Sequence, residues 1–209
     1  MTKGRFLSVE GGEGVGKSTQ ISALAKAIRG HGHDVIITRE PGGTEGAEAI
    51  RSLLLSGSAG RWQVRAEALL FAAARSDHVE RLIKPAIDSG KWVISDRFLE
   101  SSRAYQGDGS GLLDSEIMQL HAIGSGGFLP DRTLILQLDE AEASRRAAQR
   151  DGDTPDRIGG RDAAFHAMVH QAFVRFAQEE PDRIYLVDAG GDPDTVTKRL
   201  VSAISDLLI

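Results

Sequence analysis

Residues 11–18 read Gly11-Gly12-Glu13-Gly14-Val15-Gly16-Lys17-Ser18, and they fit the pattern G-x-x-x-x-G-K-[ST] of a phosphate-binding loop. The stretch follows a short apolar run, residues 6–9, and precedes a segment with helical spacing, residues 19–28. Because glycines let the backbone approach an anion, successive N–H groups and the helix N-terminus can surround a polyphosphate. Residues 11–19 are therefore predicted to bind nucleotide phosphates, with Lys17 at the β- and γ-phosphates and Ser18 on Mg²⁺. The alternative, a Gly-rich turn without a ligand, is disfavoured by both flanks.

The composition is that of an ordinary globular chain of 209 residues, with 41% hydrophobic and 26% charged residues. We expect a single domain over residues 1–209. The net charge of -5 argues against nucleic acid as a partner, and the absence of cysteine excludes disulfides, thiolate zinc sites and cysteine nucleophiles. No apolar run has the length of a membrane span, and Glu10 interrupts the apolar run near the N-terminus. We therefore expect no membrane association and a cytoplasmic location.

Strand and helix signals alternate along the chain, which predicts an α/β fold with a parallel sheet and helices on both faces. The expected strands are residues 6–9, 34–38, 92–95, 133–138 and 184–188. The expected helices are residues 19–28, 45–55, 64–76 continuing to 89, 114–123, a basic helix from about 140 to 150, 165–176 and a last helix from 193. Residues 100–111 are interpreted as a functional loop, and residues 150–162, which lack an apolar period, as a lid.

The sequence narrows the class of nucleotide-binding protein. Guanine-specific switch proteins read the base with Asn-Lys-x-Asp, and this chain contains no asparagine. The match of residues 188–191 to D-x-x-G is better interpreted as a strand end followed by a turn. A motor or remodelling ATPase would need a longer chain. A small kinase that binds two phosphorylated substrates remains the favoured interpretation.

Further blocks occur in a fixed order along most of the chain. They are Val9 to Thr19, Thr38-Arg39-Glu40-Pro41-Gly42-Gly43-Thr44, Leu70 to Arg75 with His78, Ile83-Lys84-Pro85-Ala86, Ser95-Asp96-Arg97-Phe98, Ser101, Ala104-Tyr105-Gln106-Gly107, Pro130-Asp131 and Asp156-Arg157. With these blocks the chain resembles the bacterial thymidylate kinases. The resemblance implies a P-loop kinase fold with a five-stranded parallel sheet, and phosphoryl transfer from ATP to dTMP with Mg²⁺, giving ADP and dTDP.

The chemistry implied by the resemblance suits these residue types. The acceptor is a phosphate oxygen that is largely ionised at neutral pH, because its second pKa is about 6. No strong general base is needed. Catalysis then consists of aligning two polyanions and neutralising charge, which Lys, Arg, Mg²⁺ and backbone N–H groups can do.

Site residues carry over from the family position by position. The implied catalytic residues are Lys17, Asp96, Arg97 and Arg157, and the implied metal ligands are Ser18 and Asp96. The ATP site would comprise Gly11, Gly12, Glu13, Gly14, Val15, Gly16, Lys17, Ser18, Thr19 and Arg150. The dTMP site would comprise Glu13, Arg39, Phe71, Arg75, Arg97, Ser101, Tyr105 and Gln106.

Within that set, the resemblance assigns particular contacts. Glu13 would contact the sugar 3′-hydroxyl, Phe71 would stack on thymine, and Arg75 would donate to its carbonyl edge. Tyr105 would disfavour ribonucleotides. Arg39 would lie near the acceptor phosphate, with a surface ion pair as the open alternative.

Position 14 bears on the lid, because family members without an arginine there supply one from the lid. Gly14 therefore implies a lid arginine, with Arg157 first and Arg150 and Arg161 as alternatives. The chain departs from the family pattern at Gly159, Met168 and Phe173, which bears on the lid contacts more than on the reaction. The resemblance of the helix bearing residues 66–74 to a dimer interface implies a homodimer.

Two other functions remain open at this point. One is a kinase for a different nucleoside or nucleoside monophosphate. The other is a nucleotide-dependent switch that binds a partner protein without transferring phosphate to a small molecule.

Overall fold

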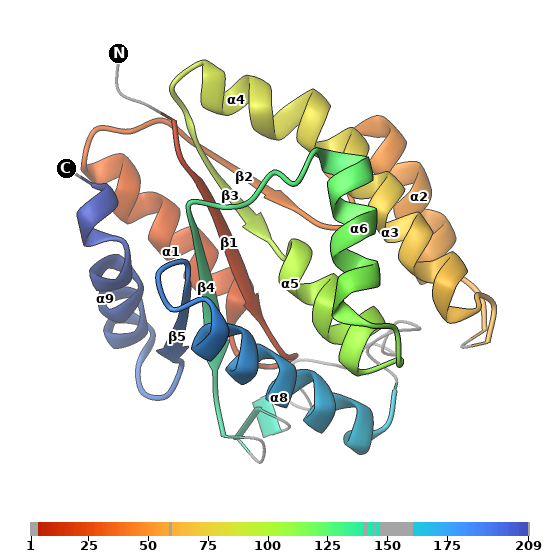
Figure 1. The fold of residues 1–209 in the computed structure, drawn as a ribbon. Coiled ribbons are helices and arrows are strands. Elements are labelled where there is room, and N and C mark those ends of the chain that lie inside the picture. Colours follow the sequence, from red (N-terminus) through yellow and green to blue (C-terminus); the bar gives the residue numbers. More distant parts are fainter. Residues whose placement is uncertain (1–3, 59, 140–141, 144, 147–160, 209) are drawn as a thin grey trace.

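The computed structural model describes residues 4–58, 60–139, 142–143, 145–146 and 161–208. Its centre is a parallel sheet of five strands in the order β2-β3-β1-β4-β5 (Figure 1). The strands are β1 Phe6–Gly11, β2 Val35–Arg39, β3 Trp92–Asp96, β4 Arg132–Gln137 and β5 Ile184–Asp188. The predicted five-stranded parallel sheet is confirmed. The chain leaves β1 toward β2 and later returns to β4 on the other side, so the carboxyl end of β1 is the switch point where ligands of such sheets bind.

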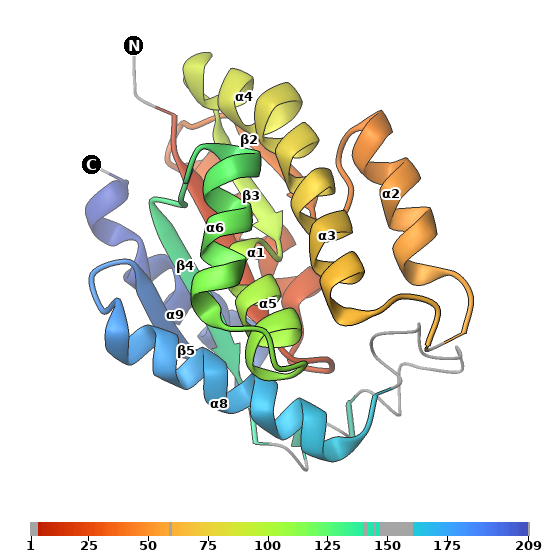
Figure 2. The same ribbon diagram turned by 45° about the vertical axis from the view of Figure 1, so that its right-hand side comes forward.

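Helices cover both faces of the sheet, as predicted (Figures 1 and 2). One face carries α1 Lys17–Gly30 and α9 Pro193–Ala203, followed by the short turn Ser205–Leu207. The other face carries α3 Val64–His78, α4 Lys84–Asp88, α5 Leu99–Ser102, α6 Asp114–Ser125 and α8 Ala163–Glu179. A π-helical turn, Val79–Ile83, joins α3 to α4, and α2 Glu45–Leu55 packs against α3.

Side chains alternate along β1 and β3, and this decides to which face the last side chain of each strand, Glu10 and Asp96, belongs. Leu7 and Ile94 belong to the core beneath α1 and α9, whereas Phe6 and Val93 belong to the core on the opposite face. By the same alternation, Asp96 shares the α1 face and the buried Glu10 shares the other face. The two acidic side chains at this end of the sheet therefore lie on opposite faces of it.

Residues 100–111, predicted as a loop, are largely helical. α5 continues into a π-helical segment, Arg103–Asp108, and five consecutive residues, 103–107, are buried. The loop prediction was wrong because it took the polar composition as a sign of exposure, whereas these polar side chains are paired inside the protein. Arg103, for example, donates to Asp114 Oδ1 at 2.8 Å and to Glu180 Oε1 at 2.6 Å.

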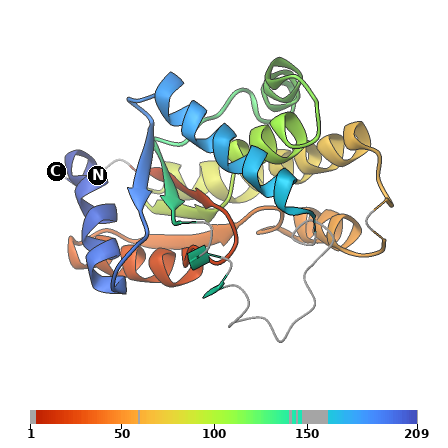
Figure 3. The same ribbon diagram turned by 90° about the horizontal axis from the view of Figure 1, so that it is seen from below.

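The segment around the predicted lid is described only at its edges (Figure 3). The Glu142 N–H donates to Asp139 Oδ1 at 3.3 Å, so Asp139 caps the start of the predicted basic helix. Residues 142–143 and 145–146 of that helix are described and helical, whereas its other residues and residues 150–160 of the predicted lid lie outside the described residues. Asp162 accepts from the Phe165 N–H at 2.9 Å and so caps α8. The last lid position therefore belongs to the start of a helix. Within the described residues, no helix combines the length and apolar character of a membrane span.

Candidate active site

The loop after β1 has the backbone geometry that its glycines predict. Gly16 caps α1 in the left-handed region at φ +88°, and a Cβ at Gly11 would lie 2.6 Å from the carbonyl oxygen of Leu136. The Lys17 ammonium folds back over the loop, where it donates to the carbonyl oxygens of Gly12 at 2.7 Å and Gly11 at 3.1 Å. Desolvation, followed by the charge of Arg97, lowers the pKa of Lys17 to about 7. A ligand with negative charge would reverse this shift.

A cavity of about 590 Å³ opens above this loop. Its lining joins the loop to the ends of the neighbouring strands and to the turn between β5 and α9. The lining residues are Glu13, Gly14, Val15, Gly16, Lys17, Ser18, Thr19, Gln20, Arg39, Glu40, Arg51, Asp96, Arg97, Arg146, Ala189, Gly191, Pro193 and Val196. The cavity has room for a nucleotide whose phosphates lie on the N-terminus of α1.

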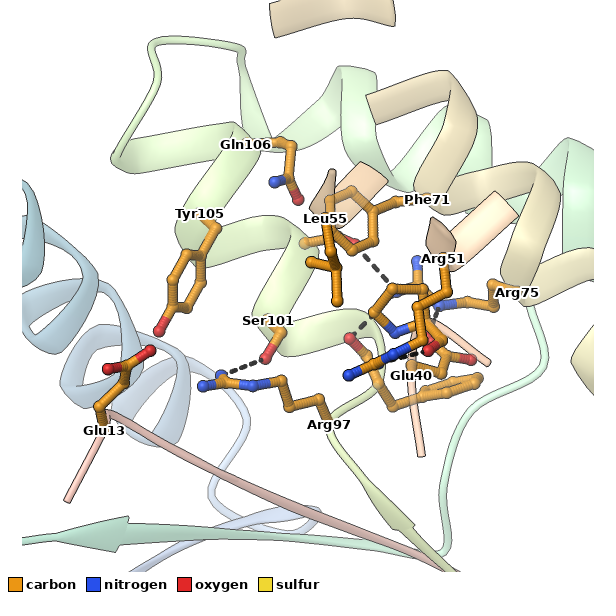
Figure 4. A pocket seen from close by; sticks show the side chains of 13 residues that line it. Glu13, Glu40, Arg51, Leu55, Phe71, Arg75, Arg97, Ser101, Tyr105 and Gln106 are labelled. Carbon is orange, nitrogen blue, oxygen red and sulfur yellow. Dashed lines mark hydrogen bonds and ion pairs between the residues drawn. The ribbon is translucent and has the colours of Figure 1, made fainter. Parts of the chain in front are cut away.

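A second, smaller cavity of about 110 Å³ lies on the α3 and α5 side (Figure 4). It combines an aromatic and aliphatic wall with charged groups at one end. Its lining residues are Glu13, Glu40, Pro41, Arg51, Leu55, Phe71, Arg75, Arg97, Phe98, Ser101, Ser102, Tyr105 and Gln106. An apolar wall with a few polar groups is typical of a site for a flat ring that carries a charged substituent.

The two cavities meet at four shared residues, Glu13, Glu40, Arg51 and Arg97. Arg97 stands between the cavities and is the one described non-glycine residue with positive φ, at +70°. Its Nη1 donates to Ser101 Oγ at 3.1 Å, and its guanidinium carbon lies 5.2 Å from the centroid of the Tyr105 ring. Figure 4 shows the side chains of Glu13 and Tyr105 pointing toward the tip of this guanidinium from the same side. A left-handed conformation at a cationic residue between two cavities is backbone strain at a functional position.

Glu10 holds the segment that carries Arg97. Its Oε1 accepts from the Phe98 N–H at 2.7 Å, and its Oε2 accepts from the Ser101 hydroxyl at 2.6 Å. Burial, followed by the charge of Glu100, raises the pKa of Glu10 to about 7. Arg97 lies within the field of this carboxylate. Burial lowers the pKa of Arg97, but Tyr105, Glu10 and Asp96 outweigh that effect and raise it, so Arg97 is a permanent cation.

A buried ion-pair network forms part of the wall of the smaller cavity. Arg75 Nε donates to Glu40 Oε2 at 2.8 Å, and its Nη2 donates to the Phe98 carbonyl and to the Ser102 hydroxyl. The ring of His78 lies between Glu40 Oε1 at 3.2 Å and Thr38 Oγ1 at 2.7 Å. The side chains of Arg75 and Glu40 are only 3–4% exposed, so their charges are compensated inside the protein.

A divalent cation fits beside the loop. Asp96 Oδ1 is buried and has no hydrogen-bond partner among the described residues, and Asp96 lines the same cavity as Ser18. Oxygen ligands suit Mg²⁺, which takes one or two protein ligands and completes its shell with phosphate oxygens and water. No group of three His, Asp or Glu side chains that could hold a metal occurs within the described ranges. The donor set therefore matches a phosphate-bound Mg²⁺ and not an all-protein metal site.

The structure gathers most of the predicted site residues. Seven of the eight residues predicted for dTMP line the smaller cavity: Glu13, Phe71, Arg75, Arg97, Ser101, Tyr105 and Gln106. The exception, Arg39, lines the larger cavity and forms an exposed ion pair with Glu48 at 3.1 Å, which is the alternative left open above. Glu13 to Thr19 of the predicted ATP site line the larger cavity, while Gly11 and Gly12 contribute the carbonyls that Lys17 contacts. Arg150 and Arg157 lie outside the described residues.

Sequence reasoning missed several lining residues. Arg51 and Glu40 line both cavities, and Arg146 lines the larger one. The turn at residues 188–191 is a strand end followed by a turn, as interpreted, yet Ala189 and Gly191 also line the larger cavity. Arg51 had a signal, since it lies one helical turn before the end of a helix that starts directly after the Arg39–Thr44 block. The turn at residues 188–191 gave no such signal in the sequence.

Comparisons with known proteins agree on one family. The family model described as Thymidylate kinase matches residues 9–200. The chain is 58% identical over 205 residues to the thymidylate kinase of Rhizorhabdus wittichii, covering 98% of this chain and 99% of that protein. It is 47% identical to the thymidylate kinase of Caulobacter vibrioides, covering 100% and 98% of the two chains. The crystal structure of thymidylate kinase from Ehrlichia chaffeensis superposes with a TM-score of 0.76 at 31% identity, covering 97% of this chain and 99% of that one.

Proposed function

The chain belongs to the thymidylate kinase family, and we propose that it transfers the γ-phosphoryl group of ATP to dTMP across the junction of its two cavities. The observation that carries this proposal is the meeting of the two cavities at Arg97. One cavity has the phosphate-binding loop and the other has an aromatic wall. A donor and an acceptor bound in them would bring their phosphates to the same cation. We treat residues 1–209 as one nucleoside monophosphate kinase domain.

ATP would occupy the larger cavity. Its phosphates would lie against the loop N–H groups and Lys17. Their negative charge would raise the pKa of Lys17 again and so keep its ammonium protonated. Its base would lie toward Ala189, Gly191 and Pro193, where the lining is apolar. Ser18 and Asp96 would hold Mg²⁺, which when bound neutralises charge on the phosphates.

dTMP would occupy the smaller cavity with its base between Phe71 and the α5 side and its phosphate toward Arg97 and Arg51. Tyr105 lies against Arg97 and would crowd a ribose 2′-hydroxyl. Glu13 would accept from the sugar 3′-hydroxyl. In this arrangement the acceptor phosphate and the γ-phosphate of ATP approach each other on the two sides of one guanidinium.

The step itself needs no general base. The bond from the γ-phosphorus to the bridging oxygen of ADP breaks as a bond from that phosphorus to a dTMP phosphate oxygen forms, and the product is dTDP. The dTMP oxygen is already ionised near neutral pH. Arg97, Lys17 and the loop N–H groups stabilise the charge on the transferring group and hold the two oxygens in line. Arg157 remains our sequence-based candidate for a further cation at this step.

A homodimer and a cytoplasmic location belong to the same proposal. The support for the dimer is an exposed apolar side chain, Leu69, on the helix that the sequence suggested as an interface, with Ile123 exposed on the neighbouring α6. Light scattering on the protein as it elutes from a size-exclusion column would measure the molecular mass in solution. A monomer at micromolar concentration would refute the dimer and leave the reaction unaffected.

One assay separates the proposed reaction from its alternatives. ADP release is coupled to a spectroscopic signal, and dTMP, dUMP, dCMP, dAMP, dGMP and the free nucleoside thymidine are offered as acceptors with Mg²⁺ and ATP. We expect turnover to be fastest with dTMP. A different preferred acceptor would identify another nucleoside or nucleotide kinase, and ATP binding without acceptor-dependent turnover would indicate a switch protein.

A further inference from the structure

Gln106 is held from behind by a buried carboxylate that the reaction does not use. Its Nε2 donates to Glu67 Oε1 at 2.9 Å, and the two residues are 1% and 2% exposed. The same carboxylate accepts from Arg161 Nη2 at 3.0 Å and 3.4 Å. Glu67 lies on α3, Gln106 on the segment after α5, and Arg161 directly before α8. Three segments thus meet at one carboxylate beside the smaller cavity.

Arg161 is itself fixed in place. Its Nη1 donates to Ser110 Oγ at 2.7 Å, and its guanidinium carbon lies 4.4 Å from the centroid of the Phe165 ring. Ser110 in turn donates to the carbonyl oxygen of Tyr105 at 2.7 Å. Glu67 forms an ion pair with this guanidinium, and a carboxylate in such a pair accepts hydrogen bonds but donates none.

This asymmetry determines the orientation of the Gln106 amide. Only the NH₂ end of the amide can satisfy Glu67, so the carbonyl end must turn away from it. Gln106 lines the smaller cavity, and Figure 4 shows its amide directed to the space beside Leu55 and Phe71. The cavity wall at this point therefore presents a hydrogen-bond acceptor whose direction does not depend on the ligand.

We infer that Glu67, acting through Gln106, is a positioning residue that selects the base. The inference rests on the proposed function, because it takes the smaller cavity as the site of the acceptor nucleotide. A fixed carbonyl suits a ring edge that donates a hydrogen bond, as the N3–H of thymine and uracil does. The unprotonated N3 of cytosine would place its lone pair against the carbonyl oxygen, leaving both buried acceptors without a donor.

The first test is Glu67→Gln, which keeps the size of the side chain and removes the asymmetry. The amide introduced by this substitution can accept from Arg161 with its carbonyl and donate from its NH₂ to the carbonyl of Gln106, so the Gln106 amide can turn over. The measured quantity is the ratio of kcat/KM for dTMP to kcat/KM for dCMP. We expect this ratio to fall about tenfold, since one hydrogen bond to the base is exchanged for a repulsive contact. A loss of packing alone would lower both values together and leave the ratio unchanged.

The matched control is Glu80→Gln, the same chemical change at an exposed residue that pairs with Lys84. Its ratio should equal that of the unmodified chain. The second variant is Gln106→Leu, which removes the amide. In that background, adding Glu67→Gln should leave the ratio unchanged, because the side chain at position 67 would have nothing left to orient. A further fall of similar size in the double variant would overturn the inference.

A measurement on the unmodified chain does not depend on any variant folding. 2′-Deoxy-3-deazauridine 5′-monophosphate has C3–H in place of the N3–H of dUMP. We expect its kcat/KM to be about tenfold lower than that of dUMP, and equal use of the two acceptors would refute a fixed carbonyl. Different results would refute the proposed reaction and the role of Glu67. Failure of the unmodified chain to phosphorylate dTMP would refute the reaction, whereas a normal dTMP rate with an unmoved ratio in Glu67→Gln would refute the role of Glu67 alone.

Discussion

The two cavities of this chain are built in different ways. In the larger one, eight of the eighteen lining residues form a single continuous stretch, residues 13–20, whose backbone conformation is set by glycines. The smaller one takes one or two side chains from each of four separate segments and six from residues 97–106, and its wall is held by buried hydrogen bonds such as those of Glu10 and Glu40. Eight consecutive residues can thus suffice to bind phosphate through the main chain. Recognition of a base and its sugar requires a folded scaffold.

This difference has a consequence for mutations. Side chains at the junction act on charge in the reaction, whereas side chains behind the smaller cavity act first on the shape and stability of its wall. We therefore expect loss of the cations Lys17 and Arg97 to reduce turnover without loss of fold, and changes in the buried network, to which the junction residue Glu40 also belongs, to reduce stability.

Lys17→Ala and Arg97→Ala should each lower kcat for dTMP by a factor of about 100 to 1,000, because each removes a fixed positive charge from the transferring group. Steady-state rates with both substrates saturating give the measurement, and circular dichroism melts check the fold. Lys26→Ala, an exposed lysine on the same helix as Lys17, is the matched control and should retain full activity. A rate near that of the unmodified chain in either active-site variant would remove that residue from the mechanism.

Glu40→Gln should destabilise the fold by about 3 kcal/mol, because it leaves the buried Arg75 without its carboxylate. Urea titration at pH 7 measures the free energy of unfolding. Glu179→Gln breaks an exposed pair with Arg175 on α8 and should cost less than about 1 kcal/mol. Equal losses in the two variants would show that the network around Arg75 adds no stability beyond that of a surface pair.

The shifted pKa of Lys17 predicts proton uptake on binding of ATP. In the free protein the ammonium loses its proton near pH 7, whereas bound phosphate favours the charged form. Binding at pH 8 should therefore take up about 0.9 proton, and the observed affinity should fall as the pH rises above 7. Calorimetry in two buffers of different ionisation enthalpy measures the uptake. Lys17→Arg, which stays charged, should show almost none, and uptake of the same size in that variant would locate the proton elsewhere.

Much of the fold and of the loop site was predictable from the sequence. The alternation of apolar runs with capped helical segments predicted five parallel strands, because strand and helix periods are local properties. The loop at residues 11–18 was recognisable because its function depends on backbone geometry alone. The resemblance to the family, and not the spacing of residues, supplied Phe71, Arg75 and Gln106.

What could not be predicted depends on long-range pairing. The polar residues after Phe98 suggested a loop, but Arg103 and Gln106 are buried because Glu180 and Glu67 lie opposite them. Neither partner is near them in the sequence. Glu67 has the pattern of a surface residue on a helix, and only its position behind Gln106 gives it a role. Charged residues cannot be assigned to the surface or the interior until their partners are known.

The left-handed backbone at Arg97 should produce the smallest of these changes, a difference in stability between two substitutions at this position. Arg97→Gly and Arg97→Ala lose the same guanidinium, but glycine should be the more stable of the two by about 1 kcal/mol, because alanine keeps its Cβ in a disfavoured conformation. Thermal melts of the two variants compare them directly. Once turnover is no longer required, laboratory evolution for heat resistance should favour glycine over other neutral residues at this position. A lysine or arginine that persists at position 97 in such a selection would then indicate that catalysis is still being selected, without any activity assay.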